Sequence, residues 1–223
     1  RRRHTRCLSD WSSDVCSSDL RLVTLEAVNG NVAFSLMLGQ SIIFQRLDLG
    51  FSPALIGAIS SAGFLGGLFG ALVAPRAVAR IGFGRLLFVT TILFGLDEFI
   101  QPLAAFVAPE FAAPLVLANF FFGGFFLLLY VVPITTFRQL AVPDRVLGRV
   151  MSVNRALTWG LGATLGYAFG GVLANATDRP TALIIGGALQ LFVPLVIFGR
   201  ARIWRWRTIE ESAAADERAA AAA

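Results

Sequence analysis

Histidine, cysteine and lysine are the residues that this chain has least of. Its 223 residues include one His and two Cys, all within the first twenty positions, and no Lys. The net charge of +5 therefore comes from arginine. Without His or Cys beyond residue 20, thiol catalysis, histidine acid–base chemistry and Cys/His zinc sites are excluded there. We predict no catalytic residue, no metal site, no cofactor and no enzymatic activity.

Residues 1–20 do not resemble a targeting peptide. Their sequence, RRRHTRCLSDWSSDVCSSDL, is similar to the conceptual translation of a sequencing-library adapter. We treat this segment as non-native and exclude it, with His4, Cys7 and Cys16, from the interpretation of the fold. The alternative is a genuine basic N-terminal tail. On our interpretation, the native protein continues upstream of Arg21.

Charged residues are also scarce, whereas apolar residues are abundant. Apolar residues make up 56% of the chain and charged residues 15%, and the mean hydropathy is +0.71. This balance is too apolar for an ordinary globular domain and is typical of a protein that crosses the lipid bilayer several times. The arginines lie in short stretches between apolar runs, which favours membrane topology over nucleic-acid binding.

Six apolar segments approach or exceed the length of about 20 residues that a bilayer crossing needs. They cover residues 23–45, 53–75, 85–107, 113–137, 149–174 and 181–203. Pro53 and Pro180 suit the first turn of a helix. The sequence therefore predicts an all-α membrane protein with a six-helix bundle over residues 21–207. Residues 208–223 are predicted to be a cytoplasmic tail, either disordered or a fraying helix.

Arginine placement predicts the orientation of the bundle. Most arginines of residues 21–207 fall on one side of the predicted spans, and only Arg46 and Arg179 fall on the other. By the positive-inside rule the arginine-rich side is cytoplasmic, so both ends of the chain are cytoplasmic. We expect an integral protein of the bacterial plasma (inner) membrane.

The most specific pattern lies in residues 133–174. An apolar segment ends near Phe137, a short basic loop follows over 138–148, and a glycine-rich apolar segment comes next. This region resembles the loop between helices 10 and 11 of the major facilitator superfamily of secondary transporters, in the exporter-like branch that includes drug and siderophore efflux proteins. The residues of this loop motif are Arg138, Asp144, Arg145, Gly148 and Arg149. The resemblance implies that the six spans are helices 7–12, half of a twelve-helix fold.

Two further motifs of that family occur in degenerate form. Residues 70–85, GALVAPRAVARIGFGR, resemble the loop between helices 8 and 9 but lack its acidic residue. Residues 162–171, GATLGYAFGG, resemble the glycine-rich antiporter motif, with Tyr167 where the motif usually has Pro. The departures put the charge-relay role of the first motif in doubt and leave the second as a weak indication of export.

The resemblance implies proton-coupled efflux of small amphipathic molecules by alternating access. The implied partners are the lipid bilayer, the missing N-terminal six-helix half and a small-molecule substrate, with no nucleic acid. One alternative is a non-transporting or inert six-helix membrane fragment or scaffold. An integral-membrane enzyme is a further alternative, which the lack of nucleophile and phosphate-binding motifs disfavours.

Glycines at four-residue spacing mark surfaces on two of the spans. Gly63 and Gly67, and likewise Gly66 and Gly70, form overlapping pairs on the second span, and Gly162, Gly166 and Gly170 lie on the fifth. Small residues at this spacing let helix backbones approach closely. Close packing of helices is sufficient to explain the pattern. The functional alternative is an interface at which helices move against each other during alternating access.

Polar and aromatic residues inside the spans are the candidate substrate contacts. Since the resemblance implies a central cavity lined by helices 7, 8, 10 and 11, we expect contacts from these helices. The fifth span places Arg155, Trp159, Gly162 and Gly166 on one helical face. Arg155 either binds an anionic substrate group or extends to the membrane surface. The candidates are Asn29, Gln40, Asn119, Phe126, Tyr130, Arg155 and Trp159. For Asn29 and Gln40, an interhelical hydrogen bond is the alternative.

Three carboxylates inside the spans are candidates for proton coupling. Asp97 and Glu98 lie near the middle of the third span, and Glu26 lies in the first. An intramembrane carboxylate is costly, which makes a function the first hypothesis. The resemblance, however, implies a peripheral position for the third span. The alternative is that this helix is short or re-entrant, with Asp97 and Glu98 near the outer surface.

Overall fold

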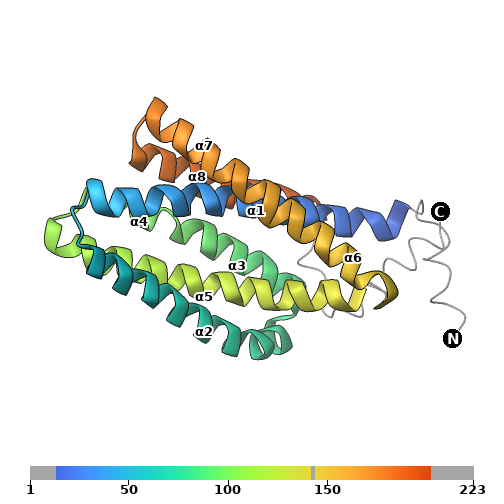
Figure 1. The fold of residues 1–223 in the computed structure, drawn as a ribbon. Helices are drawn as coiled ribbons and strands as arrows, with labels where there is room; N and C mark the ends of the chain where they lie inside the picture. Colours follow the sequence, from blue (N-terminus) through green and yellow to red (C-terminus); the bar gives the residue numbers. More distant parts are fainter. Residues whose placement is uncertain (1–13, 142–143, 202–223) are drawn as a thin grey trace, which may run out of the picture.

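The computed structural model describes residues 14–141 and 144–201, which form helices joined by short turns (Figure 1). The helices are α1 (Asp14–Leu47), α2 (Pro53–Ile81), α3 (Phe83–Asp97), α4 (Ile100–Leu103), α5 (Pro109–Ala141), α6 (Asp144–Arg155), the π-helix η2 (Ala156–Gly162), α7 (Ala163–Ala176) and α8 (Arg179–Ala201). Within these residues there is no strand.

Six helical stretches are long and apolar enough to cross a membrane. They are Leu25–Leu47, Pro53–Ile81, Phe83–Leu103, Pro109–Thr136, Met151–Ala176 and Arg179–Gly199. The predicted all-α membrane fold with six spans is therefore confirmed. The tail predicted for residues 208–223 lies outside the described residues, and α1 includes the last part of the segment that we attribute to an adapter.

Helix ends are fixed by the residues that the sequence places there. The Ser52 hydroxyl accepts a hydrogen bond of 3.2 Å from the Leu55 amide, and Pro53 opens α2. The predicted span 53–75 proved too short, because α2 continues through Pro75 to Ile81. The turn into α3 is made at Gly82, whose φ of 90° is a conformation that favours glycine.

The predicted basic loop over residues 138–148 is also largely helical. Arg138 lies in the last turns of α5, and α6 begins at Asp144. Arginine, leucine and glutamine have good helix propensity, so a helix can continue past the end of its apolar stretch. The loop between the fourth and fifth spans is consequently much shorter than the sequence pattern predicted.

Two of the predicted spans contain an interruption. The third span stops at Asp97 and resumes as the short helix α4 before ending at Leu103, earlier than the predicted residue 107. The fifth span contains the π-helix η2 between α6 and α7. A π-helix shifts the phase of side chains along a helix, and such segments are frequent at functional sites.

The helix ends gather at two ends of the bundle (Figure 1). We call the end with the α2–α3 turn and the start of α6 the arginine end, because Arg76, Arg80, Arg85 and Arg149 belong to these segments. The α1–α2, α4–α5 and α7–α8 connections lie at the opposite, distal end. Which side of the membrane each end faces stays a prediction.

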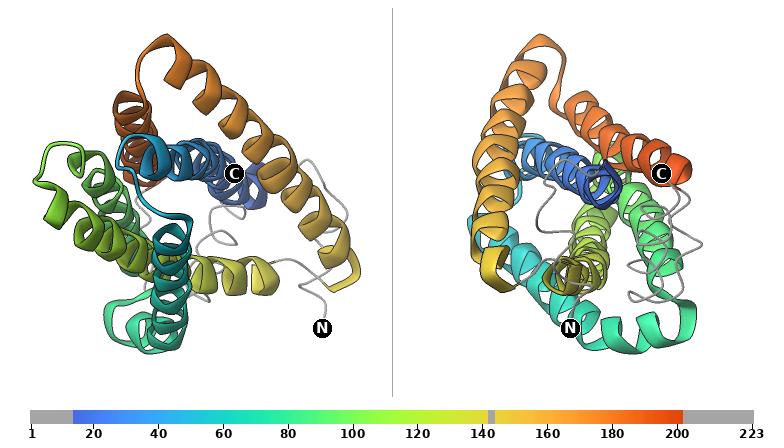
Figure 2. Two further views of the ribbon diagram at one scale, coloured as in Figure 1. Left: turned by 60° about the vertical axis from the view of Figure 1, so that its left-hand side comes forward. Right: turned by 90° about the vertical axis from the view of Figure 1, so that its right-hand side faces the viewer.

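The six spans pack against one another in a fixed set of helix contacts. Helix α2 packs along α5, α1 packs against both α7 and α8, and α3 lies between α5 and α8 (Figure 2). Near the distal end, Phe44, Ile59, Val116 and Leu183 form a core shared by α1, α2, α5 and α8. Helix α6 packs mainly on its own continuation, η2.

Glycines lie at the two closest helix contacts. A side chain at Gly66 or Gly70 would collide with the backbone carbonyl of Phe121 or Phe125 on α5. On the other side, a side chain at Gly166 would collide with the Val32 carbonyl of α1. The α2–α5 and α1–α7 contacts are therefore made backbone to backbone, as expected where small residues bring membrane helices together.

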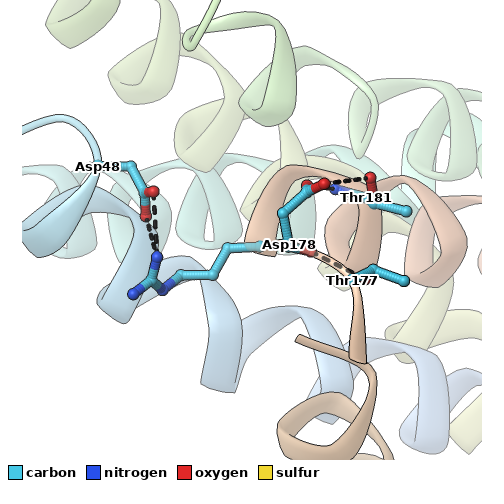
Figure 3. A network of polar contacts seen from close by, with 5 residues as sticks. Asp48, Thr177, Asp178 and Thr181 are labelled. Atoms are coloured by element: carbon cyan, nitrogen blue, oxygen red, sulfur yellow. Dashed lines mark hydrogen bonds and ion pairs between the residues drawn. The ribbon is translucent and has the colours of Figure 1, made fainter. Parts of the chain in front are cut away.

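A polar cluster ties two connections together at the distal end (Figure 3). The Arg179 guanidinium lies 3.1 Å from the Asp48 carboxylate and so joins the α7–α8 and α1–α2 connections. Beside it, Asp178 accepts hydrogen bonds from the amide and the hydroxyl of Thr181, at 2.8 and 3.0 Å. This pair of bonds satisfies donors in the first turn of α8.

Candidate functional site

A cavity of about 470 Å³ lies in the half of the bundle nearer the arginine end. Its walls come from α1, α3, α5, α8 and the segment formed by α6 and η2. The volume lies in the range of small-molecule sites, about 300–1,000 Å³. Apolar side chains contribute much of the lining, including Phe34, Phe94, Leu127, Ile134 and Trp159.

Glu26 is the carboxylate of this cavity. The side chain projects from α1 and is buried, with 3% of its surface exposed. The Tyr130 hydroxyl of α5 donates a hydrogen bond to the Glu26 carboxylate. The two residues are 104 positions apart in the sequence and lie on different helices. Glu26, a predicted proton-coupling residue, and Tyr130, a predicted substrate contact, are therefore neighbours in the structure.

Gly30 opens the cavity one helical turn beyond Glu26. A Cβ added at Gly30 would lie 3.8 Å from Glu26 Oε1 and 4.0 Å from the amide nitrogen Nε2 of Gln190 on α8. The missing side chain thus leaves a space that these two polar groups face together. Gln190 is 5% exposed, and sequence reasoning did not identify it.

Buried oxygen atoms without a hydrogen-bond partner accumulate at the cavity. Four such side-chain atoms occur among the described residues, namely Gln45 Oε1, Thr91 Oγ1, Asn154 Oδ1 and Gln190 Oε1. All but Gln45 belong to residues that line the cavity. Because buried polar atoms in folded proteins are usually hydrogen-bonded, these oxygens are the least satisfied polar groups around the cavity, although they have almost no accessible surface themselves.

Arg155 and Trp159 also line the cavity, from the junction of α6 and η2. Both side chains are exposed, Trp159 by 61%. The predicted common face with Gly162 and Gly166 is not observed, since these glycines are buried against α1. The wider turn of the π-helix between them provides the physical reason.

The other predicted substrate contacts lie outside the cavity lining. Asn29 donates a 3.3 Å hydrogen bond to the Leu189 carbonyl of α8, which corresponds to the interhelical alternative. Gln40 is buried farther along α1, toward the distal end. Phe126 joins Phe122 and Phe125 in an aromatic cluster, with ring centroids 6.2 and 5.5 Å away.

Asp97 and Asn119 form a separate buried pair between α3 and α5. The Asn119 amide donates to the Asp97 main-chain carbonyl at 2.8 Å and to its carboxylate at 3.0 Å. Gly123 lies beside the same carboxylate, where a larger residue would crowd it. Glu98 is half-buried against Gly187 of α8. The pair Asp97–Glu98 is therefore packed within the bundle and does not line the cavity.

A second polar cluster joins α1 to α4. The Ser41 hydroxyl accepts hydrogen bonds from Gln101 at 2.6 Å and from Gln45 at 3.0 Å, and all three side chains are buried. Sequence reasoning did not identify Gln101 as a candidate site residue. In the sequence, the sign of this cluster is that Ser41 and Gln45 lie one helical turn apart, so both polar side chains lie on the same face of α1.

The remaining predicted residues occupy helix ends and helix contacts. Gly148 and Arg149 are exposed on α6, whereas the side chains of Arg138, Asp144 and Arg145 lie outside the described ones. Gly63 and Gly67 face α5, and Gly162 and Gly170 face α1. No group of three or more His, Cys, Asp or Glu residues placed to hold a metal ion occurs in residues 14–141 and 144–201.

The helices around this cavity are not the set that the family resemblance implies for the central cavity of a twelve-helix transporter, which stays a prediction. Helix α2, the second span, contributes no lining residue, whereas α3 and α8 contribute Thr90, Thr91, Phe94 and Gln190. The close backbone contact of α2 with α5 holds it away from this space. The cavity is thus walled by α1, α3, α5, α6, η2 and α8, and several of its lining residues, such as Arg155 and Trp159, are exposed.

Comparison with known proteins identifies the family of the chain. The model of the Major Facilitator Superfamily matches residues 25–221, which is most of the sequence and includes all six spans. Neither the search of curated proteins nor the search of solved structures gave a match. Together with the six apolar helices, the family match shows that this chain is an integral membrane protein belonging to the major facilitator superfamily, a family of membrane transporters.

Proposed function

We propose that this chain is the C-terminal half of an exporter that moves small amphipathic molecules out of the cell in exchange for protons. The observation that carries the proposal is the cavity with Glu26 and Tyr130 in its wall. An ionisable side chain buried within a membrane-spanning bundle is expensive and is a common component of proton relays. The match to the family supports transport itself.

The lining of the cavity suits an amphipathic substrate. Phe34, Phe94 and Ile134 provide apolar surface, and Glu26 and Arg155 provide charges of opposite sign. Small-molecule sites combine a mostly apolar wall with a few polar groups that fix the orientation of the ligand. Of the three candidate coupling carboxylates, only Glu26 lines this cavity, so we assign proton coupling to Glu26.

Alternating access requires one group of helices to move relative to another around a fixed site. In this proposal the moving partner is an N-terminal six-helix half. The π-helix η2 lies between the cavity residues of α6 and the tightly packed α7, and in this proposal it is the position where the fifth span bends. Both chain ends and the arginine end would face the cytoplasm of a bacterial cell.

Transport by the full-length protein tests the proposal. Everted membrane vesicles that contain it should accumulate an amphipathic fluorescent dye when energised, and a protonophore should abolish the accumulation. Glu26→Gln should reduce proton-driven accumulation by at least about tenfold, the scale of a lost charged hydrogen bond. The matched variant Glu110→Gln, at an exposed position at the start of α5, should transport normally.

Two results would contradict parts of the proposal. Protonophore-insensitive accumulation would remove proton coupling, and normal coupling in Glu26→Gln would remove the role of Glu26. No accumulation of dyes or siderophores by the folded full-length protein would favour a non-transporting scaffold.

A further inference from the structure

Among the described residues that line the cavity, Gly30 is the one glycine. On α1 it lies one helical turn after Glu26 and one turn before Phe34, and both of those residues also line the cavity. The wall that α1 contributes therefore has a notch at Gly30, between a carboxylate and an aromatic ring. Glycine is a poor helix former, so its presence in the middle of this helix calls for a physical reason.

Helix packing accounts for the glycines at the helix contacts but does not account for Gly30. At Gly166, for example, an added side chain would collide with the Val32 carbonyl of α1, so that position has no room for one. Around Gly30 the nearest atoms to an added Cβ are Glu26 Oε1 at 3.8 Å and Gln190 Nε2 at 4.0 Å, which are ordinary contact distances. Alanine therefore fits at this position, and what the glycine provides is open space on the cavity wall.

This open space lies beside one particular oxygen of Glu26. The Tyr130 hydroxyl donates its hydrogen bond to Glu26 Oε2, whereas the oxygen next to Gly30 is Oε1. Only 3% of the surface of Glu26 is exposed, so a group in the cavity has few directions from which to approach it. A methyl group at residue 30 would lie in van der Waals contact with Oε1 and would cover it on that side.

We propose that Gly30 is a specificity-determining residue of the cavity, because its missing side chain sets how wide a group can reach Glu26. Glycine commonly occurs where a ligand must approach the backbone closely. The notch between Glu26 and Phe34 accommodates a ring or a branched group beside the carboxylate, and a side chain at residue 30 would leave room only for a narrower one. A difference of one methylene in a pocket discriminates between ligands by roughly 10- to 200-fold. The inference deepens the proposed function and rests on it for the contact between Glu26 and the substrate.

Two carbodiimides of different width test this inference on the full-length protein in lipid nanodiscs, without requiring transport. Dicyclohexylcarbodiimide is the wide probe and diisopropylcarbodiimide the narrow one, and both react with a protonated carboxyl group. The carboxyl oxygen bonds to the central carbon of the carbodiimide and the proton moves to one nitrogen. Migration of the acyl group to nitrogen then leaves a stable N-acylurea, with no atom lost. Peptide mass spectrometry measures the rate of adduct formation at Glu26. The ratio of the wide-probe rate to the narrow-probe rate reports access, because a change in the reactivity of the carboxyl group affects both probes alike.

Variants at residue 30 should change this ratio in a graded way. Gly30→Ala should lower the wide-to-narrow ratio at Glu26 by about tenfold, and Gly30→Leu should slow labelling by both probes by at least about tenfold. Both substitutions introduce a better helix former, so we expect the variants to fold, which size-exclusion chromatography checks. Gly57→Leu is the matched control, since nothing lies within 4 Å of an added Cβ there and α2 contributes no lining residue. Labelling of Asp97 and Glu98, which lie outside the lining, is an internal reference and should not change.

An unchanged ratio in folded Gly30→Ala, or undiminished labelling in folded Gly30→Leu, would overturn the inference, and so would a lack of Glu26 labelling in the unsubstituted protein. If Gly30→Leu does not fold, Gly30→Ala decides the question. The labelling and transport results are separable. A ratio that depends on residue 30 without proton-driven dye accumulation would contradict the exporter proposal and leave the width limit standing. Proton-driven accumulation with an unchanged ratio would do the reverse.

Discussion

At the scale of single residues, the pair Glu26–Tyr130 distinguishes the cavity from the other polar contacts of the bundle. Asp97 is held by Asn119 through two hydrogen bonds, and Ser41 is held by Gln101 and Gln45. Those groups are packed between helices and lie outside the cavity lining. Glu26 combines a buried carboxylate with a position on the cavity wall, which gives it access to a ligand.

A double-mutant cycle measures the Glu26–Tyr130 interaction. Tyr130→Phe keeps the ring and removes the hydroxyl that donates to Glu26. A hydrogen bond to a charged group contributes about 1.5–3 kcal/mol, so the cycle with Glu26→Gln should give a coupling energy of at least about 1 kcal/mol. Thermal unfolding of the full-length protein and its variants in detergent provides the measurement. Additive effects of the two substitutions would show that the negative charge of Glu26 adds nothing to the hydrogen bond from Tyr130.

At the scale of helices, glycine decides which spans approach most closely. The α2–α5 contact puts Gly66 and Gly70 of α2 directly against carbonyls of α5, and the α1–α7 contact does the same with Gly166. Without a hydrophobic driving force between helices in lipid, such close packing is the main source of association. The sequence spacing identified both glycine faces, but only the structure identified their partner helices.

Alanine substitution tests the α2–α5 contact. Gly66→Ala would place a Cβ against the Phe121 carbonyl, so the helices must separate, and overpacking of this kind costs about 1–3 kcal/mol. Gly57→Ala is the matched control on the same helix, since nothing lies within 4 Å of its added Cβ. Thermal unfolding should show a lower midpoint for Gly66→Ala alone. Equal midpoints for the two variants would contradict the contact.

At the scale of the whole molecule, the bundle exposes extensive apolar surface. Phe64, Phe69 and Leu72 on α2, and Leu161 and Val172 on the fifth span, are each more than half exposed. Extensive exposed apolar surface marks a region that contacts a membrane or another protein. Contact with lipid explains part of the exposed area, and the N-terminal half in our proposal would cover another part.

Cysteine labelling tests the predicted orientation of the bundle. Residues 21–223 contain no Cys, so single cysteines can be introduced into a full-length protein freed of any others. Gly148→Cys lies at the arginine end and Ala105→Cys near the distal end, and both positions are exposed. By the positive-inside rule, a membrane-impermeant maleimide should label Ala105→Cys in intact cells and Gly148→Cys only in everted vesicles. The opposite pattern would invert the proposed topology.

The sequence by itself determined the class of this protein. Twenty-residue apolar stretches separated by arginines permit little besides membrane-spanning helices, because a bilayer leaves no other way to satisfy the backbone. The spans, the starts of helices at Pro53 and near Pro180, and the glycine faces follow from such local rules. Residue patterns near residues 133–174 also sufficed to indicate the family that the comparison confirms.

Only the tertiary structure decided which polar residues form a site. Periodicity tells which residues share a helix face, but it does not tell which helix that face meets, and the π-helix η2 alters the face itself. Glu26 and Tyr130 were therefore predicted separately, and Thr91, Asn154 and Gln190 were missed. These five residues come together only because spans that are distant in sequence pack against one another.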